Sequence, residues 1–139
     1  MKIICISHGL AAYEIKKSVE MILGNQPDIS CTSFNYGEGL DELEKKIKSF
    51  YIKDENVLFL VDIFGGSPFN VASKLSQSII NSDVITGLSM PLLIDVIDIM
   101  LSEKNIRADE VYKKLSIDNY NVNYNSLINS EMEDDFYED

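Results

Sequence analysis

Four short segments rich in apolar and β-branched residues divide the chain at regular intervals, and each is followed by a segment with helical spacing. The two most apolar of them, residues 2–6 (KIICI) and 57–61 (VLFLV), are typical of strands buried in a parallel sheet. We therefore predict four strands, at residues 2–6, 29–34, 57–61 and 83–87.

The segments between these runs carry apolar residues every three or four positions, which predicts amphipathic helices. The first covers Ala11–Leu23, where Gly24 fits a left-handed helix end and Pro27 follows shortly after. Ser67 followed by Pro68 predicts a capping hydroxyl and then a proline where no donor is needed. The same spacing predicts further helices at 40–50, from Ser67 onward, at 90–101 and at 107–115.

The C-terminal part of the chain is less regular. Residues 117–127, IDNYNVNYNSL, alternate weakly, which indicates an edge strand or a strand exchanged with a second chain. Six acidic residues and no basic residue lie between Glu131 and Asp139. We therefore expect one domain over residues 1–128 and an acidic, solvated and disordered tail over residues 129–139.

Strands that alternate with helices four times indicate an open, mainly parallel α/β sheet, doubly wound, with helices on both faces in three α/β/α layers. Such sheets bind ligands beyond the carboxyl ends of their strands, where the strand order reverses. For the common order 2-1-3-4 this point lies between the first and third strands. The residues that follow these strands are Ser7, His8 and Gly9 in one loop and 62–67, DIFGGS, in the other.

The predicted crevice thus brings the single histidine of the chain, His8, next to a carboxylate, Asp62. If Asp62 accepts a hydrogen bond from one ring N–H, the other ring nitrogen keeps its lone pair and can act as a base or as a nucleophile toward phosphorus. Backbone amides at two helix starts favour a phosphoryl dianion there. Gly9 opens the first of these helices, Gly65 and Gly66 allow close backbone approach, and Ser7 and Ser67 offer hydroxyl donors.

Each of these residues also has a structural interpretation. A histidine at a strand end is often structural, an aspartate after a strand often caps a helix, and paired glycines usually mark tight turns. The convergence of all of them at one switch point favours a functional site. Neither of the nucleotide-binding fingerprints GxGxxG and GxxxxGK[ST] occurs in the sequence. No second carboxylate adjoins Asp62 to hold magnesium, so we expect neither a metal nor a cofactor.

The composition narrows the functional class further. The chain has 139 residues, with 12 Lys and Arg against 23 Asp and Glu, and a net charge of −11 argues against nucleic acid as a partner. No apolar run approaches the roughly 20 residues of a membrane span, and no convincing secretion signal is present. Cys5 and Cys31 lie in apolar or β-branched surroundings and are expected to be buried free thiols, so the cytoplasm is the default location.

Four separate stretches resemble the enzyme IIA domain of the mannose-class phosphotransferase system, the mannose, fructose and sorbose family of PTS EIIA proteins. They are SHGLAAYEIKKSVEMILG, FNYGEG, VLFLVDIFGGSPFNVAS and VITGLSMPLLIDVI, and the match runs in order from residue 2 to about residue 100. Beyond residue 105 the resemblance fades.

The resemblance implies a phosphocarrier. In that family the histidine after the first strand takes a phosphoryl group from HPr and passes it to a IIB component, which phosphorylates a sugar that enters through the membrane subunits IIC and IID. The matching residue here is His8, Asp62 matches the aspartate that orients its ring, and Ser67 matches a serine near the phosphoryl group. Ser7 stands where threonine is common. The family usually forms homodimers by exchanging a C-terminal strand, for which residues 119–125, NYNVNYN, are the candidate.

Other interpretations stay open at this point. The phosphoryl-donor subunit of a dihydroxyacetone kinase shares this fold, although GGSPFN is unlike the pattern of that group. A regulatory module that senses phosphorylation and a small hydrolase that uses His8 as a base are further alternatives. Phe64 and Phe69 either pack in the core or form an apolar rim on which carrier proteins dock. The residues at and just after the end of the fourth strand either only shape the turn there or contact a partner. They are Gly87, Met90 and Leu92.

Overall fold

A computed structural model describes residues 1–137, and side chains through residue 130. Its centre is one parallel sheet of four strands in the order β2-β1-β3-β4, which confirms the predicted fold class and strand order. The strands are β1 (Lys2–His8), β2 (Ile29–Phe34), β3 (Val57–Val61) and β4 (Asp83–Ile85). The order reverses between β1 and β3, so the carboxyl ends of these two neighbours border the switch point.

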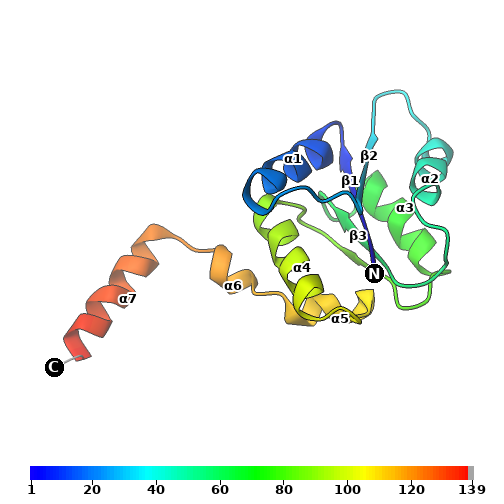
Figure 1. Ribbon diagram of the computed structural model, residues 1–139. Helices are drawn as coiled ribbons and strands as arrows, with labels where there is room; N and C mark the ends of the chain where they lie inside the picture. Colours follow the sequence, from blue (N-terminus) through cyan, green and yellow to red (C-terminus); the bar gives the residue numbers. More distant parts are fainter. Residues whose placement is uncertain (138–139) are drawn as a thin grey trace.

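Helices cover both faces of the sheet (Figure 1). Helices α1 (Ala11–Leu23) and α4 (Met90–Ser102) pack on one face, and α2 (Leu40–Lys48) and α3 (Ser67–Ser76) pack on the other. Along β1, Ile3 and Cys5 join the core beneath α1 and α4, whereas Ile4 and Ile6 join the core beneath α2 and α3. This two-residue alternation decides which face each residue at the end of β1 meets.

Several element ends differ from the predicted ones. Strand β1 continues to His8 rather than stopping at residue 6, β4 stops at Ile85 rather than residue 87, and α2 ends at Lys48 rather than residue 50.

The predicted cap of α3 is wrong, because Gly66 occupies the capping position and Ser67 is the first helical residue. Proline is tolerated at either of the first helical positions, where an N–H has no intrahelical partner, so the Ser-Pro pair fits both registers.

The C-terminal part is helical, so the predicted edge strand at 117–127 is wrong. Its place is taken by α6 (Ile117–Tyr120) and α7 (Tyr124–Tyr137), which lead away from the sheet (Figure 1). Asparagine at every second position, from 119 to 125, disfavours a strand. The helix predicted at 107–115 is divided into α5 (Ala108–Val111) and a 3-10 turn, η1 (Tyr112–Lys114).

The predicted acidic tail, 129–139, overlaps α7, and its last two residues lie outside the described part of the chain. Within residues 1–137, none of the helices combines the length and the apolar character needed to cross a bilayer.

Candidate functional site

The predicted pairing of His8 with Asp62 is present at the carboxyl edge of the sheet. Oδ2 of Asp62 lies 2.8 Å from the backbone nitrogen of His8 and 2.8 Å from its ring Nδ1. An ionised carboxylate only accepts hydrogen bonds, so Nδ1 carries the proton and Nε2 of the neutral ring keeps its lone pair. The His8 side chain is 46% exposed, and that of Asp62 is 19% exposed.

Asp62 is held in place by contacts on both sides of its carboxylate. Its Oδ1 accepts from the backbone N–H of Ile63 at 3.0 Å, while its own carbonyl accepts from the N–H of Gly87. Burial acts to raise the pKa of Asp62, but the hydrogen bonds from the backbone and ring of His8 and from Ile63 outweigh it and lower the pKa. The carboxylate is therefore ionised at neutral pH and available to orient the ring.

The polar groups of Ser7 and Gly9 bond within the chain, although Gly9 also lines the cavity beside His8. Because β1 extends through residue 8, Ser7 faces α1, where its buried hydroxyl accepts from the N–H of Ala12 at 2.8 Å and donates to the carbonyl of Gly9 at 3.2 Å. The N–H of Gly9 donates to the carbonyl of Phe34. These bonds fix the turn that follows His8, and the backbone φ of +57° at Gly9 suits a residue without a Cβ.

The start of α3 lies against the His8 ring next to its Cε1 atom. A Cβ placed on Gly66 would meet Cε1 of His8 at 3.1 Å and Cγ1 of Ile63 at 3.3 Å, so the backbone approaches the imidazole closely here. Gly65, with φ of +80°, makes the turn into this approach. No side chain caps α3, so the amide groups of its first turn are available to an anion.

A cavity of about 550 Å³ opens beside His8 and is lined by the end of β2 and the loop after it. Phe34 presents an edge-on contact to the imidazole, with ring centroids 6.0 Å apart. Glu38 holds the loop by accepting from the backbone and side chain of Asn35, and it pairs with Lys46 of α2 at 2.6 Å.

The residues at the end of β2 were not predicted from the sequence as neighbours of the site. The signal was present in the predicted strand order, because β2 borders β1 and their ends are in register, with His8 opposite Phe34. Among residues 1–130, whose side chains the structure describes, no group of three or more His, Cys, Asp or Glu side chains is arranged to hold a metal ion.

The structure locates two sets of residues whose roles the sequence left open. Gly87 has a φ of +82° and its N–H donates to the carbonyl of Asp62, and Leu92, in the first turn of α4, is buried. Both observations favour a shaping role. Phe64 and Phe69 have ring centroids 5.0 Å apart, but Phe69 packs on the core whereas Phe64 is 79% exposed.

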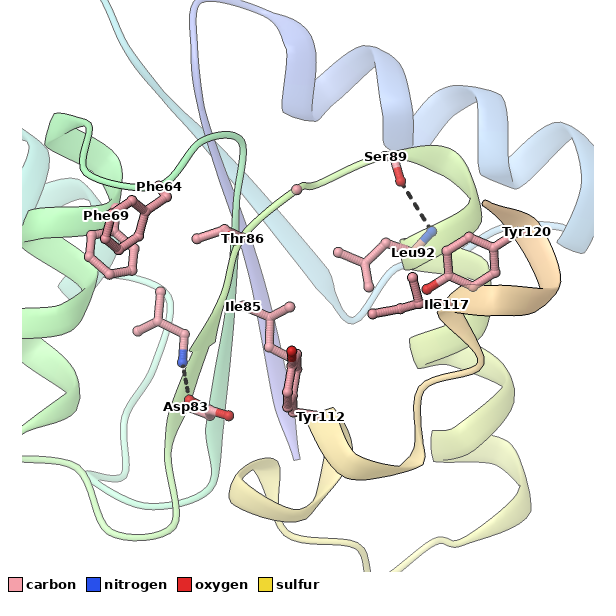
Figure 2. A pocket seen from close by; sticks show the side chains of 12 residues that line it. Phe64, Phe69, Asp83, Ile85, Thr86, Ser89, Leu92, Tyr112, Ile117 and Tyr120 are labelled. Atoms are coloured by element: carbon pink, nitrogen blue, oxygen red, sulfur yellow. Dashed lines mark hydrogen bonds between the residues drawn. The ribbon is translucent and has the colours of Figure 1, made fainter. Parts of the chain in front are cut away.

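The same aromatic pair borders a second cavity, of about 560 Å³, along the outer edge of β4. Figure 2 shows the pair on one side of this cavity and Tyr112, Ile117 and Tyr120 on the other. It is distinct from the cavity beside His8.

The sequence also matches a known family along almost its whole length. The family model described as PTS system fructose IIA component matches residues 2–131. The chain belongs to this EIIA family. The match continues past residue 105, beyond which the resemblance of the four stretches fades, and so takes in α5, α6 and the start of α7 as well.

Individual EIIA relatives agree with this assignment. The chain is 37% identical over 94 residues to the mannose-specific EIIAB component of Escherichia coli K12, covering 66% of this chain and 29% of that relative. It is 35% identical to the sorbose-specific EIIA component of Lacticaseibacillus casei, covering 69% of this chain and 71% of that one. An EIIA crystal structure from Streptococcus agalactiae superimposes with a TM-score of 0.72 at 29% identity, covering 81% of this chain and 87% of its own.

Proposed function

We propose that the protein is a phosphocarrier of a sugar phosphotransferase system that accepts a phosphoryl group on Nε2 of His8. The observation that carries the proposal is the double hydrogen bond from His8 to Oδ2 of Asp62, which directs Nδ1–H to the carboxylate, so that in the neutral ring the lone pair lies on Nε2, away from Asp62. The phosphotransferase names of the family and its relatives supply the reaction class.

The transfer needs no cofactor in this scheme. The Nε2 lone pair attacks the phosphorus of phospho-HPr, a new P–N bond forms, and the P–N bond to the imidazole of HPr breaks, leaving its electron pair on that ring. Asp62 stabilises the positive charge that develops on the His8 ring through Nδ1–H. The reverse sequence of bonds then passes the group to a IIB component in the cytoplasm, with IIC and IID acting downstream on the sugar.

The phosphoryl oxygens are received by the start of α3 in this proposal. Gly65 makes the turn and Gly66 brings the backbone close to the ring, and the uncapped first turn offers N–H donors at the positive end of the helix dipole. Ser67, the first residue of α3, contributes its hydroxyl. Ser7 and Gly9 serve by fixing the turn, because their polar groups already bond within the chain.

We further propose a homodimer in which the C-terminal segment of one chain covers the open edge of β4 in the other. The cavity there, about 560 Å³, is lined by aromatic and aliphatic side chains (Figure 2). The segment that leads away from the sheet carries exposed apolar side chains that would be buried in such a dimer, at Val122, Tyr124 and Leu127. Sedimentation equilibrium of the full chain tests this, and a monomer at micromolar concentration would contradict it.

Phosphorylation itself is tested with the full-length protein, enzyme I, HPr and phosphoenolpyruvate. Intact mass should show one added phosphoryl group, with the acid lability of phosphohistidine, and His8 is the single histidine in the sequence. His8→Ala should remain unlabelled while keeping its circular dichroism spectrum. Labelling of that variant equal to the wild type would overturn the proposal.

The dihydroxyacetone kinase alternative predicts the same labelled intermediate but a different acceptor. The names of the relatives favour the sugar system. Mixing the phosphorylated protein with a mannose-class IIB component, or with the partner subunits of a dihydroxyacetone kinase, distinguishes the two. We expect loss of the label to the IIB component.

A further inference from the structure

The two cysteines of the chain lie opposite each other on neighbouring strands. Cys5 of β1 and Cys31 of β2 are Cα partners in the parallel ladder; Cys5 belongs to the core beneath α1 and α4, and the partly buried Cys31 packs against that core. Adjacent strands are about 4.8 Å apart. A disulfide needs a Cα–Cα separation of about 4.4–6.8 Å, so the backbone already holds the pair at bridging distance.

The two thiols differ in accessibility and in acidity. Cys5 is fully buried, whereas Cys31 lies half-buried on the edge strand, where its thiol donates to the carbonyl of Ala12 at 3.6 Å. A hydrogen bond from Cys5 lowers the pKa of Cys31 against the effect of burial, and Lys16 lowers it further while Glu20 opposes this. The same hydrogen bond and burial raise the pKa of Cys5. The thiolate, which is the reactive form, therefore forms on the more accessible Cys31.

We propose that Cys5 and Cys31 are a reversible redox pair, in which a peroxide oxidises Cys31 and Cys5 then closes an intrachain disulfide. The Cys31 thiolate attacks one peroxide oxygen, the O–O bond breaks, and the departing hydroxide takes up a proton to become water. The sulfur of Cys5 then attacks the sulfenic sulfur of Cys31, the S–O bond breaks, and the oxygen leaves as a second water with the Cys5 proton. Two thiols are oxidised to one disulfide while the peroxide is reduced to two waters.

This pair is independent of phosphoryl transfer, but it lies close to the residues that fix the His8 turn. Cys31 contacts Ala12, whose N–H is held by the Ser7 hydroxyl, and Cys5 precedes Ser7 by two positions on β1. A dithiol reductant should reverse the bond by thiol–disulfide exchange.

The test uses the full-length, fully reduced protein treated with hydrogen peroxide, then denatured and alkylated with iodoacetamide. We expect both thiols to become inaccessible to iodoacetamide together, and the mass of the oxidised protein to be lower than that of the reduced, unalkylated protein by two hydrogens. Digestion should yield one linked peptide pair that contains Cys5 and Cys31. Dithiothreitol should restore both thiols. A bond between two chains, or an oxygenated Cys31 beside a still-alkylatable Cys5, would overturn the proposal.

Two variants separate the roles of the thiols, with circular dichroism as the check on folding. In Cys5→Ala, Cys31 should accumulate as a sulfenic acid that dimedone traps, because its resolving thiol is gone. In Cys31→Ala, Cys5 should stay reduced, and oxidation of Cys5 at the wild-type rate would contradict the assigned order. The wild-type peptide map decides the proposal even where the buried Cys5 tolerates no substitution.

Discussion

One oxygen atom of Asp62, Oδ2, binds both the backbone nitrogen and the ring Nδ1 of His8, each at 2.8 Å. The two residues are 54 positions apart in sequence and meet because β1 and β3 are neighbours in the sheet. The same carboxylate thus fixes the end of β1 and the orientation of the ring. A change that displaces the end of β1 therefore also changes the orientation of the His8 ring.

Replacing Asp62 by Asn should slow phosphoryl transfer to His8 far more than it weakens the fold. The amide lacks the charge that stabilises a positive ring and no longer enforces a proton on Nδ1, a loss that in the serine protease triad amounts to about 10⁴-fold. We expect a fall of at least about 10²-fold in the initial rate of transfer from phospho-HPr, measured by rapid quench.

Asp28→Asn is the matched control for that experiment. Its carboxylate is exposed and precedes β2, at the opposite end of the sheet from His8, so its transfer rate should equal that of the wild type. A rate for Asp62→Asn within a factor of about 3 of the wild type would contradict the orienting role of Asp62.

The two serines next to the site should separate stability from transfer. Ser7→Ala removes the acceptor of a buried N–H on Ala12, so we expect a loss of about 1–2 kcal/mol in the free energy of unfolding. Ser67→Ala removes a hydroxyl that caps nothing, so its free energy of unfolding should change by less than about 0.5 kcal/mol while transfer slows. Urea denaturation and the transfer assay measure the two effects, and the reverse pattern would exchange the roles we assign.

The strand order and the pairing of His8 with Asp62 followed from sequence because they rest on robust regularities. Apolar runs alternating with helical spacing define a parallel sheet, and the switch-point rule then names the loops that meet. The role of Ser7 did not follow, because it depends on β1 continuing to residue 8. Because side chains alternate between the two faces of a strand, a β1 that extends to His8 turns Ser7 toward α1 and His8 toward α3.

The C-terminal segment illustrates the opposite case. Weak alternation over 117–127 indicated a strand, but the hydrophobic pattern there is interrupted by asparagines, so neither a strand nor a long helix is strongly specified. Where local preference is this slight, contacts elsewhere decide the conformation, and such contacts cannot be read from one sequence. The cap of α3 was misplaced for a smaller reason, since a Ser-Pro pair fits two registers of a helix start.

Asp83 should destabilise the fold at neutral pH. Burial raises its pKa, with the nearby charge of Asp109 adding to the effect, although the N–H of Val84 binds the carboxylate. An acid whose pKa is raised on folding costs stability above that pKa, and the cost disappears as the pH falls and both states become protonated.

We therefore expect Asp83→Asn to raise the melting temperature at pH 7, and the gain to shrink as the pH approaches 4. Differential scanning calorimetry across this range measures it. Asp98→Asn, on the exposed face of α4, is the control and should leave the melting temperature unchanged. A gain for Asp83→Asn that stays constant with pH would mean that its ionisation is not the cause.

The adjacent glycines at the start of α3 should respond to alanine in different ways. Gly66 has an ordinary φ of −79°, but an added Cβ would meet Cε1 of His8 at 3.1 Å. Gly65 has open space around the added Cβ but a φ of +80°, which costs a residue with a side chain about 1–2 kcal/mol. Gly66→Ala should therefore displace the imidazole and slow phosphoryl transfer by about tenfold or more with little loss of stability. Gly65→Ala should lower the free energy of unfolding instead. Chemical-shift changes at the His8 ring, measured by NMR, should be large for Gly66→Ala, and an unmoved ring with a normal transfer rate would refute the proposed close approach.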